Sequence, residues 1–260
     1  MKKYNRFILV LILTGVAAFA GWKLYQQQAE YQSGEDTYAE LEQNVHISDI
    51  EAEDELEVQE PTESGETDGA EAEDDTAWPT VDFAALQAIN PDVVAWIYIE
   101  GTSINYPIVQ GEDNSYYLKH LVDGSYNGSG AIFMDFRNDS DFSDSHTIIY
   151  GHHMKNDTMF SGLDGYKKQE FYDEHPVALI VTPERNYKVE FFAGYVAGVE
   201  ADAWQLNFTL ESKEQWISAA KSKSCFESNI MPAVIDNIVT LSTCSYEFDN
   251  ARFVLLGVLK

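Results

Sequence analysis

A cysteine and an arginine stand at the ends of two apolar runs, where neighbouring strands would present them to a common site. Cys244 follows the run Ile238 to Leu241, and Arg252 opens the run Phe253 to Leu259. A thiolate is a strong nucleophile, and a fixed positive charge beside it favours the thiolate and can hold an oxyanion. The pair therefore indicates covalent chemistry at Cys244.

Arginine cannot act as a base, so a third group must move protons. His152 is the strongest candidate, because it follows the apolar run Thr147 to Tyr150 after a single glycine. Imidazole titrates near neutral pH and commonly activates a thiol nucleophile. The sequence thus predicts that two strand ends and one strand start converge on a cysteine-based site.

Each candidate also has a simpler interpretation. Cys244 would be an ordinary buried thiol, and His152 a structural histidine bonded to backbone. Arg252 would pair at the surface with Asp249 or Glu247, a contact that adds little stability. The occurrence of all three residues in this pattern favours the catalytic interpretation.

The segments around these residues resemble the sortases, the cysteine transpeptidases that attach proteins to the Gram-positive cell wall. Four segments match in the family's order, and two of them are similar to the class B branch. They are Leu241 to Cys244 with Arg252 eight positions on; Tyr150 to Met154 followed by Asn156, Thr158, Met159 and Phe160; Asn105 to Gly111; and Gly130 to Asn138. The resemblance covers roughly Trp78 to Lys260.

The resemblance implies a role for each candidate. Cys244 would attack the carbonyl after a Thr in a C-terminal sorting signal and form a thioacyl enzyme. His152, which directly follows the Gly of its motif and is therefore preferred over His153, would protonate the leaving amine and deprotonate the incoming one. Arg252 would orient the substrate and support the oxyanion.

Further implications concern the substrate. Four residues match positions that line the substrate groove of class B sortases, with ordinary packing as the alternative: Asn114, Leu118, Tyr150 and Ser242. The relatives imply a sorting motif of the type Asn-Pro-x-Thr or Ser/Pro-Pro-x-Thr. The implied partners are secreted proteins that carry this signal and a peptidoglycan or pilin amine, with no cofactor.

Charge and cysteine content limit the other classes of function. The net charge of −28 makes nucleic acid an unsuitable partner. The two cysteines permit one disulfide in an extracytoplasmic protein, and such a bond would block the nucleophile. Cys225 lies in no such motif, so a packed free thiol is the better interpretation.

Metal chemistry is not expected. The stretch Asp139 to Asp144 begins like a calcium loop, but Asp144 occupies the position that requires Gly. The adjacent pair His152 and His153 lacks the spacing of a zinc-binding helix, and two cysteines are too few for an all-cysteine zinc site.

Three parts of the chain differ in composition. Residues 1–26 hold four basic residues and no acid, and the apolar run from Phe7 through Tyr25 is about 28 Å long as a helix, close to a bilayer core. A membrane anchor is expected, with a cleaved signal as the alternative because Ala18 to Ala20 fits a cleavage site. Residues 27–77 hold nineteen acids and no base, which predicts a disordered linker. Residues 78–260 form the catalytic domain, expected outside the cell.

Apolar runs separated by turn residues predict a mainly β fold. The runs are Val93 to Ile99, Tyr106 to Gln110, Ala131 to Met134, Thr147 to Tyr150, Val177 to Val181, Tyr187 to Val199, Ile238 to Leu241 and Phe253 to Leu259. Because only short helical stretches lie between them, a closed eight-stranded barrel is favoured over a parallel sheet. A helix capped at Thr80 should precede the barrel, and one capped at Ser212 should precede the Cys244 strand.

The sequence leaves two alternative functions open. A cysteine endopeptidase would release the acyl group to water, and product analysis with and without an amine distinguishes it from a transpeptidase. A surface-tethered binding module would never form an acyl adduct at Cys244. The order of His before Cys disfavours papain-like enzymes, in which Cys comes first.

Overall fold

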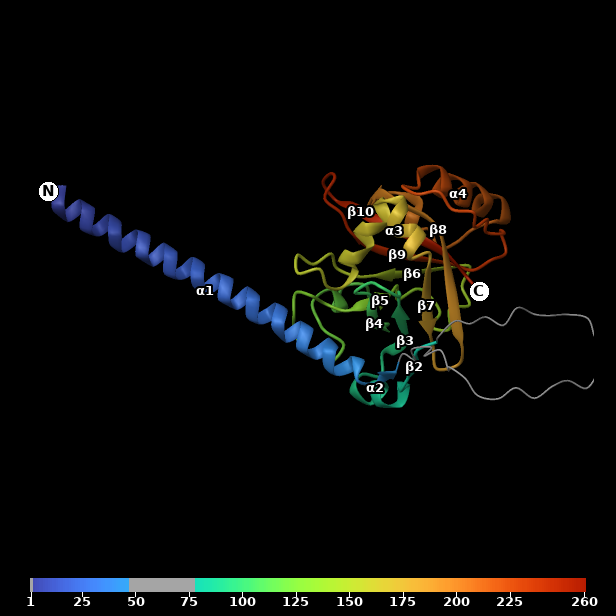
Figure 1. The fold of residues 1–260 in the computed structure, drawn as a ribbon, viewed down its shortest axis with the longest axis horizontal. Coiled ribbons are helices and arrows are strands. Elements are labelled where there is room, and N and C mark those ends of the chain that lie inside the picture. The colour runs from blue at the N-terminus through green and yellow to red at the C-terminus, as the bar shows by residue number, and fades with distance from the viewer. Residues whose placement is uncertain (1, 47–77) are drawn as a thin grey trace, which may run out of the picture.

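Eight apolar segments pair into a closed barrel in the computed structural model, which describes residues 2–46 and 78–260 (Figure 1). The strands are β3 (Val93–Tyr98), β4 (Asn105–Val109), β5 (Ile132–Met134), β6 (His146–Tyr150), β7 (Val177–Val181), β8 (Asn186–Gly198), β9 (Ile238–Cys244) and β10 (Ala251–Leu259). Their order around the barrel is β10-β8-β7-β3-β4-β5-β6-β9. The predicted fold class and all eight predicted strands are confirmed.

The strands are continuous apolar runs because side chains on both faces of the barrel wall are buried. Side chains such as Trp96, Leu241 and Phe253 are fully buried in the main core. A second cluster, which includes Phe192 and Trp216, lies between the barrel and a helix. Closure also leaves no unpaired strand edge in the barrel, which protects the sheet from pairing with other chains.

Two neighbouring pairs in the barrel are parallel, whereas the rest are antiparallel. β4 pairs with β5, and β6 pairs with β9, in the same direction. Parallel neighbours require long crossover connections. The connection between β6 and β9 contains β7, β8 and two of the described α-helices, so residues 150 and 242 meet only in the folded barrel.

Of the three short α-helices that the structure describes, two begin at residues other than those expected. The three helices are α2 (Phe83–Ile89), α3 (Gln169–Glu174) and α4 (Leu210–Lys223). Asp82, not Thr80, caps α2 through its side chain, because Thr80 pairs in a short strand. Thr209 caps α4, and Ser212 is the third helical residue of that capping box. Both errors are shifts of two or three residues, typical of cap positions.

The N-terminal segment forms a single helix, α1 (Lys2–Glu42), that reaches the barrel. Figure 1 shows its first half projecting away from the domain and its second half lying beside it. The expected linker therefore differs from the structure in residues 27–46. Tyr31, Gly34, Tyr38 and Leu41 recur at helical spacing, and the last three are buried. This sparse apolar stripe docks α1 despite the surrounding acids.

The remainder of the expected linker, residues 47–77, lies outside the described residues. The chain leaves and re-enters the described structure at one place, because β1 (Val45–His46) pairs with β2 (Thr80–Val81). The acidic segment is thus inserted between two paired strands and does not separate the apolar part of α1 from the domain.

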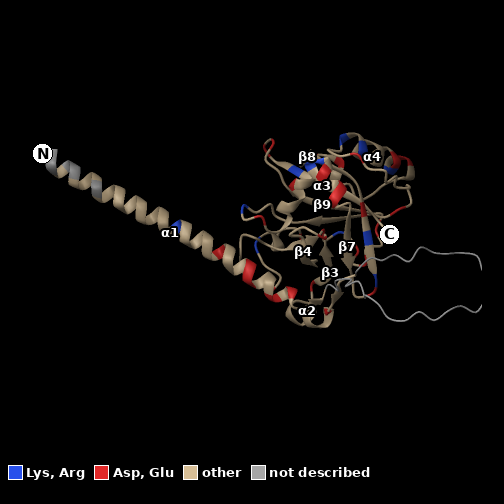
Figure 2. Ribbon diagram, in the orientation of Figure 1, with Lys and Arg blue, Asp and Glu red and all other residues tan. Residues whose placement is uncertain are grey.

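The first half of α1 has the composition of a membrane span. Within Phe7–Glu42 the most apolar window has a mean hydropathy of 2.1, and none of that window is buried against protein. The stretch from Phe7 to Trp22 holds no charged residue, and Figure 2 shows the acids of α1 gathered in its second half.

Docking of α1 predicts that Leu41→Ala lowers the free energy of unfolding by about 2–3 kcal/mol, because it removes a core side chain that is only 3% exposed. Urea unfolding of a soluble chain spanning residues 27–260 measures the change. Glu40→Ala, at an exposed neighbouring position, is the matched control and should stay within about 0.5 kcal/mol. An unchanged Leu41→Ala would contradict the docking.

Candidate active site

Cys244 and Arg252 face each other across one strand pair. β9 and β10 run antiparallel, and their register makes Cys244 and Arg252 direct partners. Side chains of directly opposed residues lie on the same face, with Cβ atoms about 5 Å apart. Both residues are half-buried. A thiol and a guanidinium are therefore neighbours at the end of the barrel.

His152 reaches the same end through the parallel pairing of β6 with β9. Tyr150 is the partner of Ser242, and the backbone N–H of Gly151 donates to the Ser242 carbonyl at 3.1 Å. His152 and Cys244 are each two residues beyond that pair, so both strands deliver them to one edge. Gly151 is favoured here, because a Cβ at this position would lie 2.7 Å from the ring of the buried Phe160.

The imidazole of His152 is oriented by backbone. Its Nε2 lies 2.8 Å from the carbonyl oxygen of Leu118. A carbonyl only accepts hydrogen bonds, so the neutral ring carries its proton on Nε2. The Nδ1 atom is then the one left to exchange a proton with a thiol or an amine.

Arg252 keeps most of its donors for a ligand. Its Nη1 donates to the Ala251 carbonyl at 2.9 Å. Glu247, one of the acids considered as its surface partner, instead pairs with Lys167 at 2.6 Å. Lys167 and the Ser245 hydroxyl lower the pKa of Glu247 to about 2, so this acid stays ionised and engaged there. In the described part of the chain, Arg252 forms no ion pair.

The predicted residues line one groove of about 470 Å³. The structure brings together all three candidate catalytic residues and all four candidate substrate-binding residues. The lining is Asn114, Leu118, Phe133, Tyr150, Gly151, His152, Val199, Trp204, Ser242, Thr243, Cys244 and Arg252.

Trp204 and Val199 belong to the groove but were not expected from the sequence. Both lie in the connection between β8 and α4, and Trp204 Nε1 lies 3.4 Å from the Ser242 hydroxyl. A tryptophan in a connection that shows no apolar periodicity was the one available signal. Its distance along the chain from every motif gave no reason to place it beside Cys244.

A buried carboxylate organises the other wall of the groove. The Asp135 side chain is fully buried and accepts hydrogen bonds from Tyr150 Oη and Asn114 Nδ2, each at 2.9 Å. Arg137 adds two bonds, at 2.8 and 2.7 Å. Burial works to raise the pKa of Asp135, but the bonds from Arg137, Tyr150 and Asn114 outweigh it and hold the pKa below its usual value.

These bonds determine what the groove offers a ligand. Tyr150 uses its hydroxyl proton on Asp135, so its oxygen can only accept from a ligand. The Asn114 Oδ1 already accepts from the backbone of Phe136 at 3.0 Å, and one Nδ2 proton is used on Asp135. The wall formed by the two side chains is therefore held in one orientation.

His153 belongs to a separate network of polar contacts outside the groove. Its Nε2 lies 2.9 Å from Asp164 Oδ2, and Asp164 Oδ1 lies 2.8 Å from Lys167 Nζ. Lys167 continues to Glu247 in the loop between β9 and β10. The chain of contacts links the loop after His152 to the loop after Cys244. His153 thus joins the two loops and does not line the groove.

Both cysteines are free in the structure, so the possible disulfide is not formed. Cys225 is free, as expected, but exposed and not packed, and it lies outside the groove lining. Partial desolvation of its Sγ atom raises the pKa of Cys225, although the residue as a whole is exposed. Of the two thiols, Cys244 is the one beside a histidine and a guanidinium.

Comparison with known proteins identifies the family. The sortase-domain family model matches residues 97–260. The sortase B of Listeria monocytogenes is 33% identical over all of this chain and 98% of its own length. The chain belongs to the sortase family.

Other similar proteins are also sortases of class B, which confirms the class. The Staphylococcus aureus sortase B is 29% identical over 99% of this chain and 97% of its own length. Its crystal structure has a TM-score of 0.65 at 35% identity, covering 68% of this chain and 86% of that one. The B. anthracis sortase B in complex with AAEK1 has a TM-score of 0.69 at 30% identity and covers 89% of this chain and 98% of that one. This sortase is accordingly a cysteine transpeptidase of the cell-wall sorting type.

The hydrogen bonds that Asp135 accepts in this sortase predict a pH-dependent loss of stability. Asp135→Asn should lower the free energy of unfolding at pH 7 by about 2–3 kcal/mol, because charge-assisted bonds to buried groups are lost. The pKa of Asp135 is lowered by folding, so its contribution is present above its unfolded pKa of about 3.9 and is lost as pH falls through the folded value.

Urea unfolding at pH 7, 5 and 3 measures this effect. The difference between wild type and Asp135→Asn should shrink below about pH 4. The exposed Asp249→Asn serves as the control and should show little difference at any pH. A difference that persists undiminished at low pH would contradict the assignment of charge to Asp135.

Proposed function

We propose that this sortase cleaves a C-terminal sorting signal after Thr through a thioacyl enzyme at Cys244 and transfers the protein to a cell-wall amine. The observation that carries the proposal is the register that opposes Cys244 to Arg252 while the parallel partner strand brings His152 into the same groove. These are the three groups that such a reaction requires.

The first half-reaction forms a thioester. The Cys244 thiolate attacks the Thr carbonyl carbon, a C–S bond forms, and the amide C–N bond breaks. The imidazolium of His152 gives its proton to the departing amine through Nδ1, while Nε2–H remains on the Leu118 carbonyl. The guanidinium of Arg252 stabilises the negative charge on the carbonyl oxygen.

The second half-reaction reverses these roles. The acceptor amine attacks the thioester, His152 takes its proton, a new amide C–N bond forms, and the C–S bond breaks to restore the thiolate. Asn114, Leu118, Tyr150 and Ser242 are proposed to contact the sorting signal. Solved structures of sortase B proteins include a substrate complex and a complex with triglycine, which supports a peptide donor and an oligoglycine-like acceptor here.

Intact-mass measurement tests this proposal. A panel of Asn-Pro-x-Thr and Ser/Pro-Pro-x-Thr peptides is incubated with a chain spanning residues 27–260, with and without triglycine. Wild type should gain an acyl adduct that triglycine converts to ligated peptide, and Cys244→Ala should gain none. Release of the acyl group to water alone, even with excess amine, would favour an endopeptidase.

The same assay measures how much Arg252 and His152 contribute to the rate. Arg252→Ala should lose on the order of a hundredfold or more in rate, as expected for loss of an oxyanion donor. His152→Ala should be slow in both half-reactions, because the leaving and incoming amines need the same proton carrier. A His152→Ala variant with wild-type rates would overturn the proposed proton transfer.

We further propose that the apolar first half of α1 anchors the enzyme in the cell membrane, with the catalytic domain outside. Basic residues precede the apolar stretch and acids follow it, which favours a cytoplasmic N-terminus. The continuity of α1 from the apolar stretch into its docked half supports an uncleaved anchor.

Fractionation of Gram-positive cells expressing the full chain tests the anchor. The protein should sediment with membranes, resist carbonate extraction and retain residues 1–26 by mass spectrometry of its N-terminus. A variant lacking residues 2–25 should be found in the soluble fraction. A mature protein that begins near residue 21 would instead identify a cleaved signal.

A further inference from the structure

The docked half of α1 contacts segments that surround His152. Tyr38 Oη donates to the Gly130 carbonyl at 2.7 Å. Glu30 binds the same turn twice, through its carboxylate to the Gly128 N–H at 2.7 Å and through its carbonyl to Asn127 at 2.9 Å. Thus α1 holds the turn formed by residues 127–130.

That turn packs directly against the imidazole. Gly130 has a positive φ of 59°, and a Cβ there would lie 2.5 Å from the Tyr117 carbonyl and 3.1 Å from His152 Cδ2. The neighbouring Leu118 carbonyl is the one that binds His152 Nε2. A shift of the turn therefore displaces both the ring's packing surface and the segment that orients it.

A second contact from α1 reaches the loop that carries His152. Asn156, four residues after the histidine, donates to Glu35 Oε1 at 2.7 Å. The loop closes on itself, because Thr158 donates to Asn156 Oδ1 at 3.0 Å and the Phe160 N–H donates to the His152 carbonyl at 2.9 Å. Glu35 thus restrains the loop that carries His152.

We propose that α1 acts as a positioning element for the reaction, with Tyr38 and Glu35 as positioning residues that hold His152 through the 127–130 turn and through Asn156. The inference rests on the proposed function, in which His152 transfers the protons. Neither residue lines the groove, so both act through other groups. A small displacement of a proton-transfer group is sufficient to slow a reaction strongly.

The properties of the two side chains fit this role. Burial raises the pKa of Tyr38 well above its usual value, so the hydroxyl remains a donor to Gly130 at all working pH values. The Tyr38 ring also packs edge-on against Tyr106, at 5.2 Å between ring centres. The hydroxyl of Tyr106 in turn accepts from the Met159 N–H at 3.0 Å, in the same loop as Asn156.

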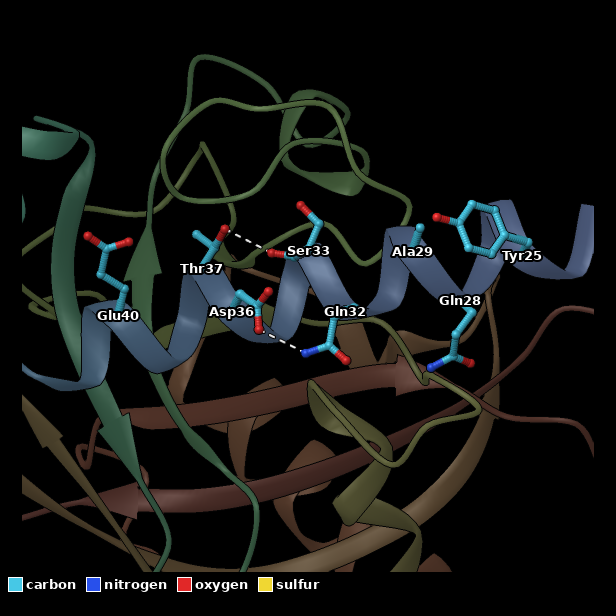
Figure 3. Close-up of a pocket in the computed structure, with 8 residues that line it drawn as sticks. All are labelled: Tyr25, Gln28, Ala29, Gln32, Ser33, Asp36, Thr37 and Glu40. Carbon is cyan, nitrogen blue, oxygen red and sulfur yellow. Dashed lines mark hydrogen bonds between the residues drawn. The ribbon is translucent and has the colours of Figure 1, made fainter.

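The opposite face of α1 provides matched controls. Figure 3 shows this face, where Tyr25, Gln28, Ala29, Gln32, Ser33, Asp36, Thr37 and Glu40 line a hollow of about 540 Å³. This hollow shares no residue with the groove of Cys244. Within residues 2–46 and 78–260, the one side-chain partner of Asp36 is Gln32 of the same helix, which donates to it at 2.8 Å. Its removal leaves the contacts to the domain intact.

The test uses the full chain in detergent micelles, triglycine, and whichever peptide of the Asn-Pro-x-Thr and Ser/Pro-Pro-x-Thr panel forms the acyl adduct. Tyr38→Phe removes only a hydroxyl, and Glu35→Ala removes the acceptor of Asn156. Each should lower kcat by about five- to twentyfold while KM for the peptide changes less than about twofold, because proton transfer is impaired and the groove is not. Glu35→Gln keeps an acceptor oxygen and should recover most of kcat.

Urea unfolding of each variant gives the fraction of folded chains, and kcat is expressed per folded active site. Asp36→Ala and Glu40→Ala should retain wild-type kcat. The inference is overturned if Tyr38→Phe and Glu35→Ala match wild type per site, if Glu35→Gln is as slow as Glu35→Ala, or if the control variants fall equally. Wild type without acyl transfer to any peptide, or His152→Ala with wild-type rates, would contradict the proposed function itself.

Discussion

The parallel pairing of β6 with β9 is the constraint on which the site depends. It aligns Tyr150 with Ser242 and leaves His152 and Cys244 equally far beyond the pair. β9 is paired on its other side with β10, which supplies Arg252 opposite Cys244. A slip of one residue in either ladder would turn Cys244 to the opposite face of the sheet. Closure of the barrel prevents such a slip, because every strand has two neighbours.

Beyond the strand ends, side-chain networks determine the positions of the loops. Asp135 holds Tyr150 and Asn114 on one wall, and the contacts from His153 through Asp164 and Lys167 tie together the loops after His152 and Cys244. Buried polar groups of this kind are costly unless they are paired. Their pairing here gives each loop a single favourable arrangement.

The N-terminal helix adds an external support to this arrangement. Because α1 is unbroken from its apolar half to the residues docked on the domain, it leaves no flexible joint between the proposed anchor and the catalytic domain. The acidic segment begins and ends at the paired strands β1 and β2, beside the docked helix. Our proposals thus assign to one helix both attachment to the membrane and support of the loop that carries His152.

The sequence by itself determined the strands, the family and seven residues of the groove, among them Cys244, His152 and Arg252. Apolar runs indicate which segments are buried, and the motifs around His152 and Cys244 are each contiguous in the chain. Both the runs and the motifs can therefore be recognised without knowledge of the fold. It also placed Asn114, Leu118, Tyr150 and Ser242 at a common surface by resemblance, and the structure brings them into one groove.

Only the tertiary structure decided which strands pair, that Trp204 joins the groove, that Asp135 orders its wall, and that α1 docks beside His152. These features depend on contacts between residues far apart in the chain, such as Glu30 with Gly128 and Glu35 with Asn156. Local composition reports whether a residue is suited to burial, but not its partner. The acids of α1 therefore predicted a linker, although Tyr38 and Leu41 are buried against the domain in the folded protein.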